Sequence, residues 1–113
     1  MAIIYKIFRA GEYTAFAAAG RSAGAPVDLA DGYIHFSTAD QVEATAAKHF
    51  AGAADLKLLA VEADRLGDAL KWEVSRGGAL FPHLYQELTA EDVVWVRDLL
   101  FEDGRYRFGG LAV

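Results

Sequence analysis

The alternation of hydrophobic and polar positions predicts short strands with two helices in the first half of the chain. Residues 3–7 form a β-branched and aromatic run that is typical of a strand. Residues 12–19 are predicted as a helix because apolar residues recur there at helical spacing, and Gly20 is suited to end it. Residues 20–32 contain three glycines, one proline and two aspartates, which predicts a long loop.

A second strand is predicted around His35, with a helix directly after it. Alternate side chains of a strand share a face, so Ile34 and Phe36 point one way and His35 points the other. The following helix is predicted over residues 39–51, where Thr38 stands at the capping position.

The second half of the chain predicts mainly strands. Residues 56–63 form a nearly continuous apolar run, which favours a central strand. Residues 70–75 alternate between apolar and polar side chains, as in a strand with two different faces. Residues 81–85 are predicted to be extended, and Pro82 confines them to a sheet edge or to the start of a strand.

The C-terminal region predicts a β-hairpin. Asp103-Gly104 lies between two strand-like runs, which is a strong hairpin signal and would pair Phe101 with Tyr106. Because most strands follow the helices instead of alternating with them, the order of elements favours an α+β fold over a doubly wound sheet.

Composition narrows the class of protein further. The length of 113 residues predicts one domain over residues 1–113, and 54% hydrophobic residues are too many for a disordered chain. The absence of cysteine excludes disulfides and thiolate metal sites, and the three histidines lack metal-ligand spacing, so no metal is predicted. The net charge of −5 argues against nonspecific nucleic-acid binding, so Arg97, Arg105 and Arg107 are interpreted first as surface or ion-pair residues.

The sequence also carries expectations about location and assembly. It has no apolar run of about 18 residues for a membrane span and no signal-peptide pattern. We therefore expect a cytoplasmic protein without a membrane partner, present as a monomer or a small homo-oligomer. The apolar tail Leu111-Ala112-Val113 is expected either to pack at a subunit contact or to fray.

His35 is the most informative candidate for chemistry. It shares a predicted strand face with Ser37, and Thr38 follows at the start of a helix. Histidine and hydroxyl groups beside a helix N-terminus suit a ribose or a phosphate. Two simpler interpretations stay open: His35 as a partly buried structural histidine, and Thr38 as a helix cap alone.

Two further segments carry polar groups on predicted strands. Glu73 is followed by Arg76 and two glycines, so a carboxylate, a guanidinium and backbone amides could bind a polar ligand. His83 and Tyr85 share a face if residues 81–85 are extended. We expect these groups and His35 to line one cleft. The alternatives are a solvated outer face for Glu73, a surface histidine for His83 and a core tyrosine for Tyr85.

These segments resemble the bacterial family called domain of unknown function 952. The resemblance extends over nearly the whole chain, to about Leu99. It is carried by Ile4-Tyr5-Lys6-Ile7, Asp31-Gly32-Tyr33-Ile34-His35-Phe36-Ser37-Thr38, Leu70-Lys71-Trp72-Glu73, Ser75-Arg76-Gly77-Gly78 and Leu80-Phe81-Pro82-His83-Leu84-Tyr85.

The resemblance implies an ADP-ribosyltransferase-like fold, with two small packed β-sheets and two or three helices around a cleft that binds NAD. The layout is similar to that of the transferases that remove a 2′-phosphate from tRNA using NAD. Tyr5 matches their first tyrosine, while Lys6 stands where they have a histidine. His35 and Ser37 match their second strand.

The resemblance implies an NAD-using enzyme. His35 would bind the ribose hydroxyls, and Tyr5 or Tyr85 would stack on the nicotinamide. Glu73 or His83 would stabilise the positive charge that develops on the ribose. The expected cofactor-binding set is completed by Lys6, Ser37, Thr38 and Arg76.

Two alternatives to that enzyme remain. The first is a nucleotide or small-ligand binding module that keeps the cleft without the chemistry, which Lys6 in place of a histidine suggests. The second is an acid–base hydrolase built on His35 and Glu73, for which no activated nucleophile is visible in the sequence.

Overall fold

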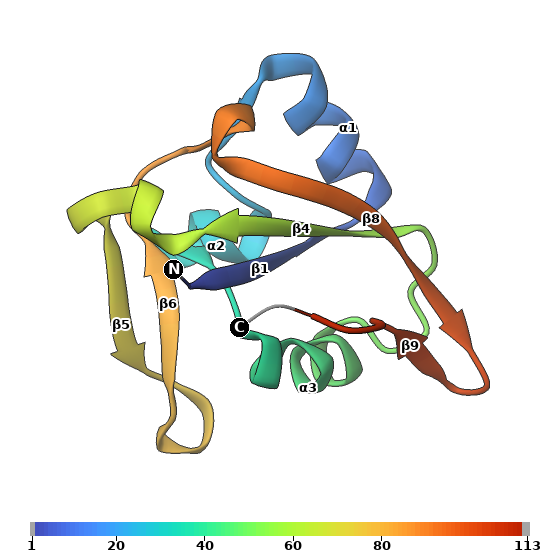
Figure 1. Ribbon diagram of the computed structural model, residues 1–113. Coiled ribbons are helices and arrows are strands. Elements are labelled where there is room, and N and C mark those ends of the chain that lie inside the picture. The colour runs from blue at the N-terminus through green and yellow to red at the C-terminus, as the bar shows by residue number, and fades with distance from the viewer. Residues whose placement is uncertain (1, 112–113) are drawn as a thin grey trace.

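A four-stranded antiparallel sheet runs through the molecule, and a three-stranded antiparallel sheet lies beside it (Figure 1). The computed structural model describes residues 2–111, apart from the side chain of Arg76. The α-helices are α1 (Ala10–Ala19), α2 (Pro26–Asp31) and α3 (Ala39–His49), and the 3-10 turns are η1 (Ala63–Ala69), η2 (Arg76–Gly78) and η3 (Ala90–Asp92). The strands are β1 (Ile3–Phe8), β2 (Arg21–Ser22), β3 (Ile34–His35), β4 (Leu56–Glu62), β5 (Leu70–Val74), β6 (Leu80–Leu84), β7 (Leu88–Thr89), β8 (Val93–Glu102) and β9 (Arg105–Arg107).

The four-stranded sheet has the order β1-β4-β8-β9, so the apolar strand β4 is central, as its sequence predicted. Helix α3 packs against one face of this sheet, where Val42 and Ala46 meet Leu58 and Ala60 in one core cluster. Helix α1 lies toward the opposite face, with Phe16 buried beside Phe8. The sheet is therefore apolar on both faces in its centre.

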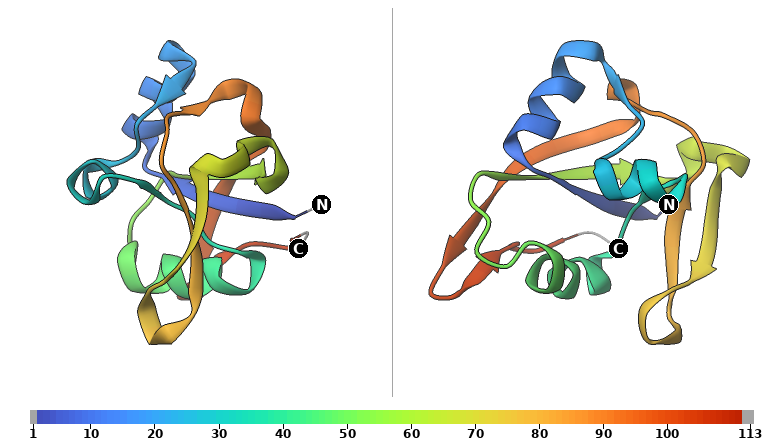
Figure 2. Two further views of the ribbon diagram at one scale, coloured as in Figure 1. Left: turned by 90° about the vertical axis from the view of Figure 1, so that its left-hand side faces the viewer. Right: turned by 180° about the vertical axis from the view of Figure 1, so that it is seen from behind.

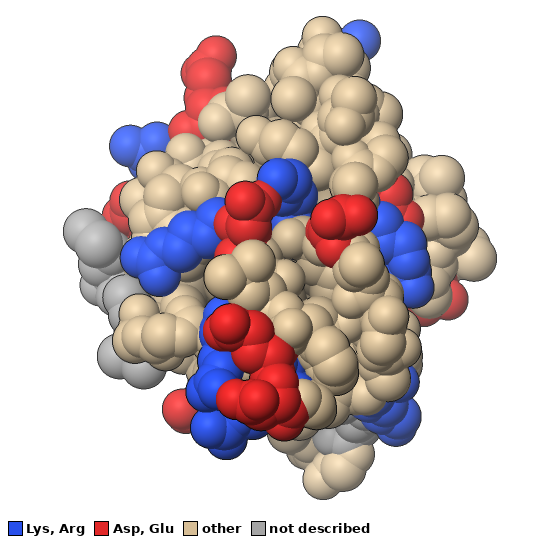
Figure 3. Space-filling view, turned by 90° about the vertical axis from the view of Figure 1, so that its right-hand side faces the viewer, with Lys and Arg blue, Asp and Glu red and all other residues tan. Residues whose placement is uncertain are grey.

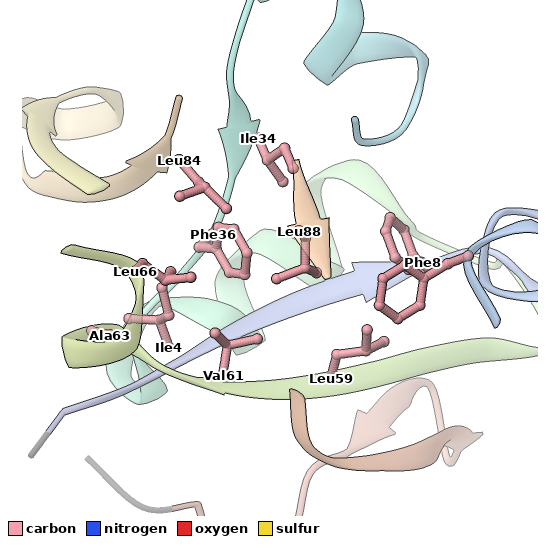
Figure 4. Close-up of a cluster of buried hydrophobic side chains, with 11 residues drawn as sticks. Ile4, Phe8, Ile34, Phe36, Leu59, Val61, Ala63, Leu66, Leu84 and Leu88 are labelled. Atoms are coloured by element: carbon pink, nitrogen blue, oxygen red, sulfur yellow. The ribbon is translucent and has the colours of Figure 1, made fainter. Parts of the chain in front are cut away.

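A second core cluster joins the two sheets (Figure 4). Ile4 and Phe8 come from β1, while Ile34 and Phe36 come from the strand region that carries His35. These side chains point toward one another in the close-up. Ile34 and Phe36 are buried on one side of that strand region. Because successive side chains of a strand point to opposite faces, His35 lies on the other side.

The three-stranded sheet has the order β3-β6-β5, which corrects the prediction for Pro82. Pro82 lies in the central strand and not at an edge or a strand start. Its carbonyl accepts a hydrogen bond from the Phe36 amide at 3.0 Å, but proline has no N–H to return it. The β3–β6 ladder ends here, and the next residue, Ser37, exchanges backbone hydrogen bonds with Tyr5 of β1 instead. The chain thus passes from one sheet to the other beside Pro82.

One other expectation from the sequence is wrong. Residues 20–32 are not one long loop, because β2 and α2 form within them. The strand predicted over residues 70–75 is confirmed as β5, but its apolar face is only partly covered, since Trp72 is 44% exposed and Val74 is 70% exposed. Both lie in the β5–β6 hairpin, which extends away from the four-stranded sheet (Figure 2). The core does not reach that far along the hairpin.

The predicted C-terminal hairpin is confirmed. Asp103 and Gly104 have φ of 53° and 81°, the positive values that a type I′ turn requires. Phe101 pairs with Tyr106, and their ring centroids are 4.9 Å apart. Arg107 lies within 3.0 Å of the Asp103 carboxylate, so it is an ion-pair residue as expected. Acidic and basic side chains are interspersed on this side of the molecule (Figure 3).

The architecture is a mixed α+β fold of antiparallel sheets, as predicted. Residues 2–111 contain three α-helices and a small two-stranded sheet of β2 and β7 in addition to the two larger sheets. No helix among these residues is long and apolar enough to cross a membrane. Residues 112 and 113 of the apolar tail lie outside the described part of the chain, so the expectation for that tail stays untested.

Candidate functional site

A cavity of about 460 Å³ opens between β1, α2, α3 and the strand region around His35. Its apolar wall includes Val42 and Phe81. Polar side chains in the lining come from several elements, among them Lys6, Asp28, Asp31, His35, Ser37 and His83. A cavity of this size with a few convergent polar groups is the usual form of a small-molecule site.

Asp28 connects three parts of the chain at the wall of this cavity. Its carboxylate is fully buried and accepts hydrogen bonds from the Lys6 Nζ at 2.7 Å, the Ala25 amide at 2.7 Å and the His35 amide at 3.0 Å. His35 Nδ1 also lies 2.5 Å from Asp28 Oδ1. The Lys6 ammonium, in turn, donates to the His35 carbonyl at 3.0 Å. Asp28 therefore fixes both the backbone and the ring of His35.

The surroundings of Asp28 keep it ionised. Burial acts to raise the pKa of this carboxyl, but the hydrogen bonds from His35 and the charge of Lys6 outweigh it and lower the pKa to about 2. Close packing supports the same arrangement, because Gly24 approaches Asp28 so closely that a Cβ at that position would lie 2.5 Å from the Asp28 Cβ. This close approach requires a glycine.

The lowered pKa of Asp28 makes stability depend on pH in the acid range. A carboxyl with a pKa of about 2 when folded and an ordinary value of 3.8 stabilises the fold above pH 4, and this contribution is lost as the pH falls toward 2. The loss is expected to be about 2 kcal/mol. Urea titrations between pH 2 and pH 6 measure it, and Asp28→Asn should remove this part of the slope. An unchanged slope in the variant would assign the acid sensitivity to other carboxyls.

His35 has a carboxylate on each ring nitrogen. Nδ1 contacts the buried Asp28, and Nε2 lies 2.9 Å from Asp31 Oδ2. Carboxylates only accept hydrogen bonds, so both contacts are satisfied together when both nitrogens carry protons. The two carboxylates differ in solvent exposure, because the Asp31 side chain is 46% exposed whereas that of Asp28 is inaccessible to solvent.

A second histidine is held in the neighbouring strand. His83 Nδ1 lies 2.8 Å from Glu73 Oε1, and the Tyr85 hydroxyl donates to the same oxygen at 2.6 Å. These two hydrogen bonds lower the pKa of Glu73, and the bond from Tyr85 has the larger effect. The hydrogen bond to Glu73 in turn raises the pKa of Tyr85 to about 12. Tyr33 stacks on His83 with ring centroids 4.2 Å apart. The His83 ring is therefore fixed in its plane and at Nδ1.

Comparison with sequence families identifies the group to which the protein belongs. The model of the family described as "Protein of unknown function (DUF952)" matches residues 7–96. The chain belongs to the DUF952 family. The family predicted from the sequence motifs is thereby confirmed, and a search of curated proteins gave no match.

This DUF952 protein is similar to solved structures of CC0527 from Caulobacter crescentus. The crystal structure of CC0527 is 53% identical in sequence, with a TM-score of 0.89, and the match covers 93% of each chain. The solution NMR structure of CC0527 is 52% identical, with a TM-score of 0.84, and the match covers 94% of this chain and 91% of that one. Both are structural-genomics targets, and they establish the fold of the DUF952 chain.

The structure brings together four of the residues that the sequence singled out. His35, Glu73, His83 and Tyr85 form one cluster around Tyr33, in which the His35 and His83 rings are 5.4 Å apart and those of Tyr33 and Tyr85 are 5.1 Å apart. The strand segments that carry these residues therefore lie together, as the sequence predicted. Neither Glu73 nor Tyr85 is among the residues that line the larger cavity, so the expectation of one cleft holds only for His35 and His83, and Glu73 instead holds His83.

Other predicted residues have structural partners. Lys6 is buried and forms the ion pair with Asp28, and Tyr5 is buried against Trp95. The Ser37 hydroxyl lies 3.0 Å from that of Thr45. Thr38 is the N-cap residue directly before α3, and its amide donates to Gln41 Oε1 at 3.0 Å, so its role as a helix cap is confirmed. Tyr5, Lys6 and Ser37 also line the cavity, whereas the Arg76 side chain lies outside the described part of the structure.

Sequence reasoning missed Asp28 and Asp31 and gave Tyr33 no role. Pro26 followed by Asp28 is a helix-start signal. Proline suits the first turn of a helix, and an aspartate at the third helical position accepts a hydrogen bond from a backbone amide that has no partner within the helix. That signal would have predicted α2, but not the contacts of Asp28 with Lys6 and His35, which are 22 and 7 residues away. Among residues 2–111, no group of three histidine, aspartate or glutamate side chains is arranged to hold a metal ion.

Proposed function

We propose that this DUF952 protein binds a nucleotide in the cavity beside His35, with NAD as the first candidate. One observation carries the proposal: the same cavity presents a histidine fixed by two carboxylates and the cationic side chains of Arg9 and Lys48. Imidazole and carboxylate groups bind ribose hydroxyls, while guanidinium and ammonium groups bind phosphates. A nucleotide contains both kinds of group within one small molecule.

The dimensions and the remaining walls of the cavity support this ligand class. Its volume of about 460 Å³ falls within the range of small-molecule sites, which is about 300–1,000 Å³. Phe50 and Phe81 provide apolar surface for a flat ring. Arg9 stacks on Phe50 with its guanidinium carbon 4.7 Å from the ring centroid, which orders this cation beside the cavity.

The resemblance to ADP-ribosyltransferase-like proteins supports NAD and suggests transferase chemistry at the nicotinamide–ribose bond. In that reaction His35 binds the ribose, and His83, which lines the cavity, is closer to the ligand than Glu73. The alternative of a binding module is favoured by Lys6. It occupies the place of a transferase histidine, and its ammonium is engaged with Asp28 and the His35 carbonyl.

Calorimetric titration with NAD, ADP-ribose and AMP tests the proposal. The wild type should bind at least one of them, and Arg9→Ala should weaken that binding about tenfold by removing a phosphate-binding charge. Arg107→Ala is the matched control, because Arg107 lies in β9 and pairs with Glu102 and Asp103. No heat with any of the three nucleotides, or equal weakening by both variants, would contradict nucleotide binding in this cavity.

A product assay then separates the enzyme from the binding module. Release of nicotinamide from NAD by the wild type supports transferase or glycohydrolase chemistry. Binding of NAD without any product supports the module. Both assays use the full chain.

A further inference from the structure

The two histidines of the site face each other across paired strands. His35 of β3 and His83 of β6 are direct partners in the antiparallel ladder, and their rings lie edge to face with centroids 5.4 Å apart. Both side chains line the cavity. Directly opposed residues on one face of a sheet lie close enough to act on one small group bound beside both of them.

The hydrogen bonds of His83 suit it to accept a proton. Glu73 holds Nδ1, and because a carboxylate only accepts hydrogen bonds, the neutral ring carries its proton on that nitrogen. Nε2 then keeps its lone pair. The ionised state of Glu73, supported by the hydrogen bond from Tyr85, stabilises the imidazolium that forms once Nε2 takes a proton.

The hydrogen bonds of His35 suit it to donate a proton. Both of its nitrogens contact carboxylates, which only accept hydrogen bonds, so each contact uses an N–H of the ring. The Nε2 proton is directed at Asp31, whose exposed side chain is free to move aside for a ligand. The Nδ1 contact to buried Asp28 remains in place and orients the ring.

We propose that His83 and His35 act as general base and general acid in the hydrolysis of a ribonucleotide phosphodiester. This inference rests on the proposed binding of a nucleotide and adds the bond that is broken. His83 Nε2 takes a proton from water, and the water oxygen forms a bond to phosphorus. The bond from phosphorus to a ribose oxygen breaks, and His35 Nε2 gives that oxygen its proton. One water is consumed, and proton exchange with solvent restores both histidines.

The proton donor distinguishes this reaction from cleavage at nicotinamide. A ribose oxygen leaves as an alkoxide and needs a proton, which an imidazolium supplies. Nicotinamide leaves NAD as a neutral ring and needs none. A donor and an acceptor side by side in the wall of one cavity therefore favour a phosphodiester, and the cations Arg9 and Lys48 in the same cavity suit its charge.

A single-nucleotide substrate is the simplest test of this reaction. A ribonucleoside 2′,3′-cyclic phosphate is a small ribonucleotide phosphodiester and needs no second nucleotide site. We expect the wild type to hydrolyse 2′,3′-cyclic AMP to adenosine monophosphate. In ¹⁸O-labelled water the product phosphate should gain one ¹⁸O atom, a readout that requires no variant.

Variants assign the roles. His35→Asn and His83→Asn should each lower the rate about 100-fold or more, the usual size of a general acid or base contribution. Glu73 is a positioning residue, so Glu73→Gln should lower kcat about tenfold while KM stays within about threefold. Arg107→Ala, outside the cavity, should leave the rate unchanged. Circular dichroism of each variant shows whether it is folded.

The outcomes separate this inference from the proposed function. Binding of 2′,3′-cyclic AMP without hydrolysis would overturn the acid–base assignment and leave nucleotide binding intact. Wild-type rates in both histidine variants would overturn it as well. Conversion of NAD to nicotinamide, lost in the same variants while the cyclic nucleotide is untouched, would replace it with chemistry at the nicotinamide bond. No binding of any nucleotide would overturn both proposals.

Discussion

Asp28→Ala is expected to lower the free energy of unfolding by about 3–5 kcal/mol, the usual cost of removing one partner from a buried ion pair. The substitution leaves the Lys6 ammonium buried without its counter-charge and frees the Ala25 and His35 amides. Few single changes away from the hydrophobic core remove so many contacts at once. Urea denaturation at pH 7, followed by tryptophan fluorescence, measures the loss.

Asp98→Ala is the matched control for this prediction. Asp98 also pairs with a lysine, Lys57, but its side chain is 68% exposed, so the change should cost about 1 kcal/mol or less. Adding Lys6→Met to Asp28→Ala should recover part of the stability, because no uncompensated charge then remains buried. Equal losses in the two aspartate variants would show that burial does not control the strength of these pairs.

Phe36→Ala is expected to cost about 3–5 kcal/mol as well, by leaving a cavity where the two sheets meet. The Phe36 ring is buried among residues from β1, β3 and β6 (Figure 4). The conservative change Phe36→Leu should cost less than about 1.5 kcal/mol. Because Phe36 stands between His35 and Ser37, the alanine variant should also weaken nucleotide binding.

Phe101→Ala is the control, since that phenylalanine is 48% exposed in the β8–β9 hairpin. It should lose only its contact with Tyr106, about 1 kcal/mol. Thermal unfolding of the three phenylalanine variants compares them directly. A larger loss for Phe101→Ala than for Phe36→Ala would contradict the placement of the core.

The clustering of candidate residues around His35 could be predicted from the sequence, but the side chains that hold His35 in place could not. The alternation of Ile34, His35 and Phe36 placed the histidine on the face away from the core, and the structure confirms it. The grouping of His35 with Glu73, His83 and Tyr85 was also expected and is present. The roles of these residues in binding and catalysis, and the ADP-ribosyltransferase-like assignment, stay predictions.

Local signals determined the elements of this protein. Strand β4 follows from its apolar run, α3 from the Thr38 and Gln41 cap, and the last hairpin from Asp103-Gly104. Each of these depends on backbone preferences or on hydrogen bonds between residues a few positions apart, which the order of residues contains.

Tertiary structure alone decided the contacts that give the site its chemistry. A proline is tolerated in the central strand β6 because the N–H that Pro82 lacks would face the point where the chain leaves β3. Beyond that point the chain pairs with β1 and needs no hydrogen bond from residue 82. Asp28 became the buried counter-charge of Lys6 and the orienting group of His35 because helix α2 folds back against β1. Such contacts join residues distant in sequence, and their strength depends on burial, which local patterns of hydrophobic and polar residues do not specify.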